Sequence, residues 1–259
     1  MHAPASPTIP ADLLLAAYRS GIFPMADSRE DEDVYWVEPR ERAVIPLADF
    51  RPSHSLAKVI RQDRFRITCN ADFAGVLAAC AAPRPGHPET WINRRIAASY
   101  EALHLAGHAH SIECWLDGEL VGGLYGVGFD RAFCGESMFS RATDASKVAL
   151  AWLVALLRRA GCVLLDCQFM TDHLATLGAV QISRDAYLER LAEAVDGGPG
   201  PSLYDTYVAF GAEAEGLGVA SGTAVAGAAG RAAGAVLDAP GAGPSSPGKL
   251  ILQSLTQTS

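Results

Sequence analysis

The middle of the chain constrains the fold more than any other part of the sequence. Residues 111–116 and 119–127 have the two-residue period of strands, and Asp117-Gly118 separates them. An Asp-Gly pair between two such runs is a strong signal for a tight hairpin. A third strand is predicted at residues 132–138. The pattern therefore predicts a meander of three antiparallel strands.

The helix predicted after this meander is apolar on almost every side. It covers residues 145–160, with a cap at Thr143 or Asp144 and Gly161 just beyond its end. A helix of this kind is buried on most sides. A further apolar strand follows at residues 162–168 and is expected to be parallel. Together these elements predict an α/β fold with a mixed sheet covered by helices, as in acetyltransferase-like (GNAT-like) domains.

The chain divides into three regions by composition and pattern. We expect a small N-terminal domain over residues 1–42, the acetyltransferase-like domain over 43–196, and a low-complexity tail over 197–259. The tail is mostly glycine, alanine, serine and proline, which bury too little apolar surface to offset the entropy of ordering, so it is predicted to be disordered. Other helices are expected at residues 11–20, 53–61, 72–80, 91–106, 172–177 and 184–195.

The charge is unevenly distributed along the sequence. The net charge is -8, which argues against a nucleic-acid partner because phosphate binding depends on lysine and arginine. However, residues 51–66 contain five basic side chains and one acidic side chain, Asp63. This segment is either a local surface for nucleic acid or an ordinary solvated helix face, and charge alone favours the second.

Several classes of protein are disfavoured by what the sequence lacks. The six cysteines lie singly in apolar segments, without the spacing of zinc or redox motifs. Gly107 is expected to end the helix that carries His104, so His104, His108 and His110 cannot present ligands on one helix face. We therefore expect no metal. No apolar run approaches the roughly 18 residues that span a bilayer, and the start does not resemble a secretory signal, so a cytoplasmic protein is expected.

Three polar residues occur where the pattern predicts burial. Asp166 and Gln168 are two apart on a strand and share a face, while Glu136 lies near the end of the third strand. A buried carboxylate is costly unless it is partnered or used in function. Singly, each is more often a structural hydrogen-bonding group. Two such carboxylates on strands flanking one buried helix favour a functional site.

The apolar helix offers a wall for that site. Leu150, Leu153 and Leu157 lie along one face of it, which is also ordinary core spacing. Arg141 precedes the helix N-terminus, where free N–H groups can meet a phosphate. The glycine-rich pyrophosphate loop that acetyltransferases use for coenzyme A is absent. This absence counts against a coenzyme A donor.

A set of short motifs, spread over residues 11–191, resembles the leucyl/phenylalanyl-tRNA-protein transferase family. The motifs are Phe23-Pro24-Met25, Trp91-Ile92, Gly107-His108-Ala109-His110-Ser111-Ile112-Glu113, Gly135-Glu136-Ser137-Met138-Phe139-Ser140-Arg141, Ala145-Ser146-Lys147, Asp166-Cys167-Gln168 and Asp172-His173. The resemblance implies a small N-terminal domain before an acetyltransferase-like domain. It also implies transfer of leucine or phenylalanine, with methionine as a further candidate, from aminoacyl-tRNA to proteins that begin with arginine or lysine, which marks them for N-degron degradation. It implies no cofactor.

The resemblance also assigns roles to particular residues. Asp166 and Gln168 match the family's proposed catalytic pair, with Asp166 orienting Gln168, and Glu136 matches an active-site glutamate suited to a cationic acceptor. The donor pocket carried over by position consists of Leu124, Leu150, Leu153, Leu157 and Leu165, with Trp91 near the terminal adenosine. Lys58 and Arg61 fall where the family contacts the tRNA acceptor stem, and Arg141 is a further candidate for tRNA binding.

Two details depart from the family or from our strand pattern. Met25 stands where many members have tryptophan, and leucines at 153 and 157 replace bulkier residues, so a wider pocket would favour phenylalanine. Strand alternation turns Leu165 away from Asp166, so that either the strand bulges or Leu165 only backs the pocket.

Two other functions fit the same pattern. The first is an acyltransferase that uses coenzyme A, or a peptidoglycan-type aminoacyl acceptor, on the same fold. The second is a noncatalytic module that binds tRNA or degrons, which would tolerate the loss of Asp166 and Gln168.

Overall fold

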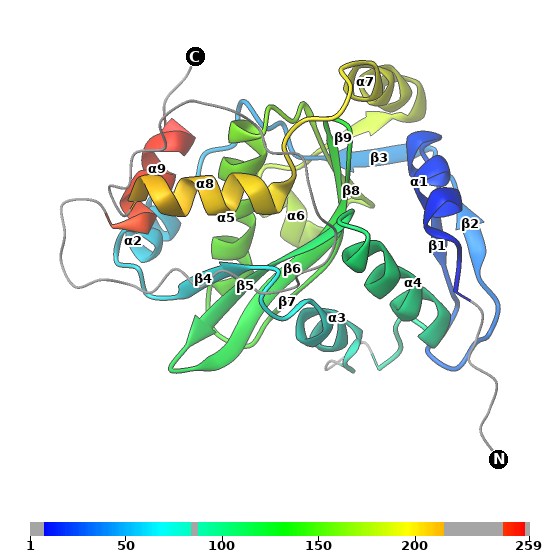
Figure 1. Ribbon diagram of the computed structural model, residues 1–259, viewed down its shortest axis with the longest axis horizontal. Helices are drawn as coiled ribbons and strands as arrows, with labels where there is room; N and C mark the ends of the chain where they lie inside the picture. The colour runs from blue at the N-terminus through cyan, green and yellow to red at the C-terminus, as the bar shows by residue number, and fades with distance from the viewer. Residues whose placement is uncertain (1–7, 84–87, 215–245, 257–259) are drawn as a thin grey trace.

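The computed structural model describes residues 8–83, 88–214 and 246–256. Its main sheet has the strand order β4-β5-β6-β7-β8-β3-β9 (Figure 1). The strands are β3 (Glu41–Val44), β4 (Arg66–Cys69), β5 (Ala109–Leu116), β6 (Glu119–Phe129), β7 (Ala132–Ser140), β8 (Leu164–Gln168) and β9 (Val180–Ser183). Only the β7–β8 pair is parallel among the described strands.

The predicted meander and the strand after it are confirmed. β5, β6 and β7 are joined in antiparallel order, and Asp117 and Gly118 form the β5–β6 turn with φ angles of 52° and 84°. Two successive positive φ angles are what a tight hairpin with the right strand twist requires. β8 then pairs with β7 in parallel, after the crossover through α5 (Ala145–Arg159).

Helices cover both faces of this sheet (Figure 1). One apolar core contains residues of α2 (His54–Arg61), α5, α8 (Leu203–Ala214) and α9 (Pro247–Thr256). The other contains residues of α1 (Ala11–Arg19), α3 (Phe73–Ala81), α4 (Arg94–Leu105) and α7 (Arg184–Asp196). Helix α5 has twelve buried residues out of fifteen, as its apolar surface predicted. The result is a mixed sheet between helical layers, consistent with the acetyltransferase-like expectation.

A small N-terminal unit lies beside the sheet. It consists of α1 and a two-stranded sheet formed by β1 (Phe23–Met25) and β2 (Tyr35–Val37). The sequence pattern assigned Phe23-Pro24 only to the end of the helix, whereas the structure continues them into a strand. The chain enters the main sheet at β3, close to residue 42, where we propose the boundary between the two units.

The C-terminal region requires a correction. We expected disorder from residue 197, yet α8 and α9 are ordered helices that pack on α5. In α8, the side chains of Leu203, Tyr207 and Phe210 recur every three or four residues and are buried. Composition averaged over the whole tail concealed these short amphipathic segments. Residues 215–245 and 257–259 of the predicted tail lie outside the described residues.

Two smaller features also differ from the sequence pattern. Helix α4 begins at Arg94 because Asn93, rather than Thr90, caps it: its side chain accepts a hydrogen bond from the Ile96 N–H at 2.8 Å. The short helix α6 (Asp172–Thr176) is present as expected, but the edge strand β9 that follows it was not predicted. A four-residue strand beside only one neighbour carries a weak period-two signal.

Candidate active site

The site lies where two strands of the main sheet separate. β7 and β8 pair only from Ala132↔Leu164 to Cys134↔Asp166, and β8 continues beside β3 instead. A cavity of about 530 Å³ opens at this split. It is lined by Leu124, Tyr125, Gly135, Glu136, Ser137, Met138, Leu150, Leu153, Leu165, Cys167, Thr171, His173 and Leu174.

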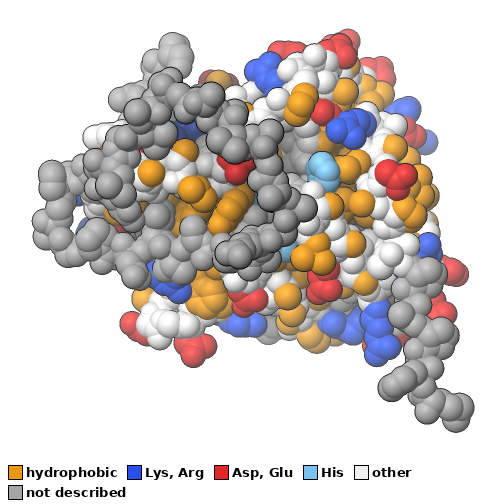
Figure 2. Space-filling view, viewed as in Figure 1, with side chains coloured by type: hydrophobic (Ala, Val, Ile, Leu, Met, Phe, Trp, Pro, Cys, Tyr) orange, Lys and Arg blue, Asp and Glu red, His pale blue; other side chains and the backbone are white. Residues whose placement is uncertain are grey.

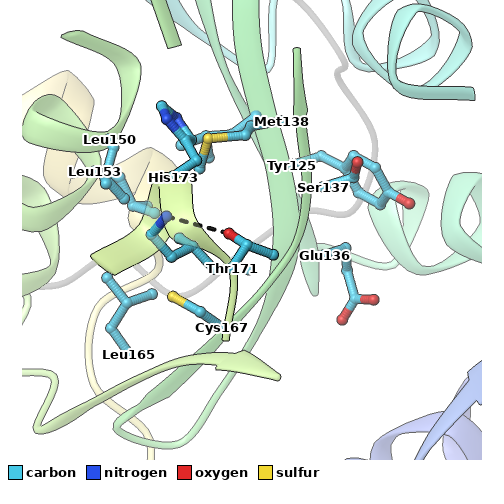
Figure 3. Close-up of a pocket in the computed structure, with 13 residues that line it drawn as sticks. Tyr125, Glu136, Ser137, Met138, Leu150, Leu153, Leu165, Cys167, Thr171 and His173 are labelled. Carbon is cyan, nitrogen blue, oxygen red and sulfur yellow. Dashed lines mark hydrogen bonds between the residues drawn. The ribbon is translucent and has the colours of Figure 1, made fainter. Parts of the chain in front are cut away.

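One side of the split is apolar. Leu150 and Leu153 of α5 face Leu165 of β8 across the cavity (Figure 3). Leu124 of β6 also lines it. These four leucines were all predicted from the family resemblance. Leu165 and Cys167 alternate with Asp166 along β8, so alternation explains why Leu165 lines the cavity although it points away from Asp166.

Two other predicted pocket residues do not line this cavity. Leu157 of α5 is buried in the core and borders a smaller hollow beside Phe133. Trp91 lies before α4, where its ring packs edge-on against Tyr100, with ring centroids 6.5 Å apart. The sequence pattern gave no pocket role to Met138, Cys167 and His173, which also line the cavity. All three lie within the motifs that resemble the family, so the sequence does carry a signal for them.

Glu136 sits on the other side of the split, with its carboxyl turned away from the leucines (Figure 3). It is the extra residue of a β-bulge, because Tyr125 pairs with Ser137 while Gly126 pairs with Gly135. A bulge re-aims a side chain relative to regular alternation. Here it brings the carboxyl of Glu136 beneath the N-terminal helix α1 and helix α4, which provide its partners.

Two tyrosine hydroxyls hold the carboxyl of Glu136. Tyr18 donates to Oε1 at 2.7 Å and Tyr100 donates to Oε2 at 2.9 Å, and the two hydroxyl oxygens lie 2.6 Å apart. Burial raises the pKa of Glu136 to about 7, although the hydrogen bonds from Tyr18 and Tyr100 and the nearby Gln168 amide oppose that rise. A carboxyl with a pKa near neutrality can gain or lose a proton under ordinary conditions. From the sequence, Tyr18 is only an apolar helix position and Tyr100 has no assigned role.

Asp166 is completely buried and does not line the cavity. Its carboxylate forms an ion pair with Arg42 of β3, with Nη2 2.6 Å from Oδ2. Its other oxygen, Oδ1, accepts a hydrogen bond from the backbone N–H of Gln168 at 2.8 Å. Asp166 is therefore bonded to the backbone of Gln168, and its partner Arg42 was not predicted from the sequence.

Gln168 ends β8 in the left-handed backbone region, with φ at 62°. Its side chain is buried and close enough to Glu136 to lower the pKa of that carboxyl. Even so, the Gln168 amide nitrogen makes no hydrogen bond of normal geometry within the described part of the chain. A buried donor without a partner is costly, and Gln168, like Asp166, is not among the residues that line the cavity.

The predicted tRNA-binding residues lie away from the cavity. Lys58 and Arg61 are exposed on α2, and neither forms an ion pair with another described residue. Arg141 is exposed between β7 and α5, where its guanidinium packs over the ring of Phe139 at 5.3 Å. Within the described ranges there is no cluster of three or more histidine, cysteine or acidic residues that could hold a metal ion. None of the described helices is long and apolar enough to cross a membrane.

The fold and site define an α/β protein with a leucine-lined cavity on one side of a split sheet and a buried, titratable carboxyl on the other. Comparison with known families agrees with this architecture. The leucyl/phenylalanyl-tRNA protein transferase family model matches residues 44–192, and the model of that family's N-terminal domain matches residues 8–40. This chain belongs to the leucyl/phenylalanyl-tRNA-protein transferase family, and it is a transferase enzyme.

Named relatives support the same assignment over most of the chain. The leucyl/phenylalanyl-tRNA-protein transferase of Novosphingobium aromaticivorans is 58% identical over 255 residues, which is 97% of each chain. Those of Rhizorhabdus wittichii and Zymomonas mobilis are 62% and 60% identical over 183 residues. These alignments cover 71% of this chain in both cases, and 74% and 68% of the respective relatives.

Proposed function

We propose that this enzyme transfers leucine or phenylalanine, with methionine as a further donor, from aminoacyl-tRNA to the N-terminal amine of proteins that begin with arginine or lysine. The products are then substrates for N-degron degradation, and we place the reaction in the cytoplasm. The observation that carries this proposal is the split cavity, which has an apolar wall of four leucines on one side and the carboxyl of Glu136 on the other.

The two sides of the split suit the two substrates. The apolar side, formed by Leu124, Leu150, Leu153 and Leu165, fits the side chain of an aliphatic or aromatic amino acid. The ionised carboxyl of Glu136 suits a cationic acceptor that approaches from the other side. Leu157 supports the donor pocket from the core rather than touching the donor.

The proposed reaction consumes no reactant other than the two substrates. The acceptor amine attacks the ester carbonyl carbon, the new amide bond forms, and the bond to the ribose 3′ oxygen breaks. The proton lost by the amine ends on that oxygen. The unpartnered Gln168 amide nitrogen can donate to the oxygen that gains negative charge during the attack, and such donors stabilise the transition state. Asp166 holds Gln168 in place.

Binding of the tRNA is assigned to residues outside the cavity. Lys58, Arg61 and Arg141 are exposed cations suited to phosphates, and Trp91 lies beside Tyr100, where its half-buried indole can stack on the terminal adenosine. None of these four residues lines the donor cavity, so tRNA affinity and the chemical step depend on different residues.

Transfer by the purified full-length protein tests this function. We expect labelled leucine or phenylalanine to move from charged tRNA to a peptide that begins with arginine or lysine, without coenzyme A. A peptide of the same sequence with an acetylated N-terminus is the control, because it lacks the attacking amine. Acetylation of amines with acetyl coenzyme A, and no transfer from tRNA, would favour the acyltransferase alternative. Binding of charged tRNA without either reaction would favour the binding module.

A further inference from the structure

Arg42 lies at the junction of three parts of the molecule. It sits on β3, is 2% exposed, and directs its guanidinium toward β8, the N-terminal unit and α7. Nε donates to both oxygens of Asp166 at 3.1 and 3.2 Å, and Nη2 donates to Oδ2 at 2.6 Å. Nη1 donates to the Gly21 carbonyl oxygen at 2.7 Å. One guanidinium therefore connects the loop after α1 to the strand that carries Gln168.

Two aromatic rings fix the plane of this guanidinium. Its central carbon is 4.9 Å from the centroid of the Phe23 ring and 4.2 Å from that of Tyr187. Nη2 also donates to the Tyr187 hydroxyl, which in turn donates to Oδ2 of Asp166, each at 3.2 Å. A planar fork with a fixed orientation holds a carboxylate more rigidly than a flexible ammonium group can.

This arrangement continues to the site through one hydrogen bond. Asp166, held by Arg42, accepts from the backbone N–H of Gln168 and so stabilises a left-handed backbone that a glutamine rarely adopts. That conformation places the Gln168 side chain beside Glu136. Without a fixed Asp166, the backbone of Gln168 loses the interaction that compensates for its unfavourable φ angle.

We propose that Arg42 is a positioning residue for transfer, which fixes Asp166 so that the Gln168 amide is held beside Glu136, and which couples the placement of the N-terminal unit to that geometry. This role rests on the proposed function. Arg42 touches no part of the cavity, so it acts only through Asp166 and Gln168. Its contact with Gly21 makes the N-terminal unit part of the support for the reacting groups.

Arg42→Lys tests the proposal because it keeps the charge and removes the fork. We expect kcat for transfer to fall about 10- to 100-fold, as a small misplacement of a reacting group would cause, while KM for charged tRNA stays close to wild type. In a Gln168→Ala background, Arg42→Lys should lower kcat little further, because Arg42 acts through the Gln168 amide that is already absent. An equal loss of kcat in both backgrounds would overturn the proposal, as would a lower melting temperature with kcat unchanged.

The matched control is Arg19→Lys. Arg19 also joins the N-terminal unit to the main sheet, through a salt bridge to Asp130 at 2.7 Å, but it does not contact Asp166, Gln168 or Glu136. Its variant should keep the wild-type kcat. If Arg42→Lys fails to fold, the double variant Arg42→Gln with Asp166→Asn removes both charges and leaves no unpaired buried ion. It should fold with the same loss of kcat, and a wild-type kcat in this variant would overturn the proposal.

A second measurement separates this role from the transfer function itself. Hydrogen exchange of the Gln168 backbone amide should be slow in the wild type and in Arg19→Lys, and faster in the Arg42 variant, because the Asp166 acceptor is no longer held. Exchange that is unchanged by the Arg42 variant would overturn the positioning role. If the wild type shows no transfer, the proposed function is wrong. The hydrogen-exchange comparison still tests whether Arg42 positions Gln168.

Discussion

At the scale of single residues, Glu136 links the chemistry of the site to the stability of the fold. Its carboxyl is buried and accepts hydrogen bonds from two tyrosine hydroxyls, whereas the buried guanidinium of Arg42 pairs with Asp166. The hydrogen bonds to the carboxyl only partly offset the effect of burial on its pKa. The pKa of Glu136 is therefore raised to about 7 from the ordinary glutamate value of 4.5. A raised pKa of an acid means that folding favours its neutral form.

The variant Glu136→Gln should expose this effect in stability as a function of pH. The stabilising contribution of the neutral carboxyl is complete below pH 4.5 and is lost as the pH rises to about 7. The wild type should therefore lose stability relative to Glu136→Gln over this interval, by a few kcal/mol in total, and the difference should be constant above it. Urea unfolding at a series of pH values measures the two curves, and parallel curves would contradict the raised pKa.

The residues of the site differ in how far the sequence could predict them. Asp166 and Gln168 could be placed on one face because strand alternation is a local rule. Their surroundings depend on contacts between distant parts of the chain: Arg42 meets Asp166 across 124 positions, and Tyr18 meets Glu136 across 118. No local pattern predicts such pairings. The bulge at Glu136 was likewise not predicted, since it appears only in the register of β6 and β7.

At the scale of elements, the strongest local signals gave the most accurate predictions. The predicted bounds of the hairpin at Asp117-Gly118 and of the apolar helix α5 lie within a residue or two of the observed bounds. Both predictions depend only on residues that are close together in the sequence. Helix α8 was missed because its apolar residues stand in a segment of low-complexity composition. Tyr207 and Phe210 nevertheless follow helical spacing, and that spacing outweighs average composition.

Helix α8 should contribute measurably to stability. Phe210 is 1% exposed and its ring packs edge-on against Trp152 of α5, with centroids 5.5 Å apart. Phe210→Ala removes this packing and leaves a cavity, which should cost about 3–5 kcal/mol in the free energy of unfolding. Val208→Ala in the same helix is the control, because Val208 is 43% exposed and should change stability by only about 0.5 kcal/mol. Equal urea midpoints for the two variants would show that α8 does not support the core.

At the scale of the whole molecule, charge and shape together bear on tRNA binding. The net charge of -8 repels nucleic acid in general, and positive and negative side chains are interspersed on the face seen in Figure 2. The exposed cations of α2 are a local exception. Asp63, the acidic residue of that segment, accepts a hydrogen bond from the Gly248 N–H of α9 at 2.8 Å. Helix α9 therefore contacts the acidic residue of this segment, and Lys58 and Arg61 form no ion pair with another described residue.

The salt dependence of tRNA affinity tests whether α2 is the binding surface. Each phosphate that a cation neutralises releases counterions, so the slope of log K against log salt falls by about one for each such cation removed. The double variant Lys58→Ala with Arg61→Ala should therefore bind charged tRNA more weakly and with a slope lower by about two. Arg190→Ala is a suitable control, because Arg190 is exposed on α7, which packs on the opposite face of the sheet. Its slope should match the wild type, whereas an unchanged slope in the α2 variant would place the tRNA on another surface of the molecule.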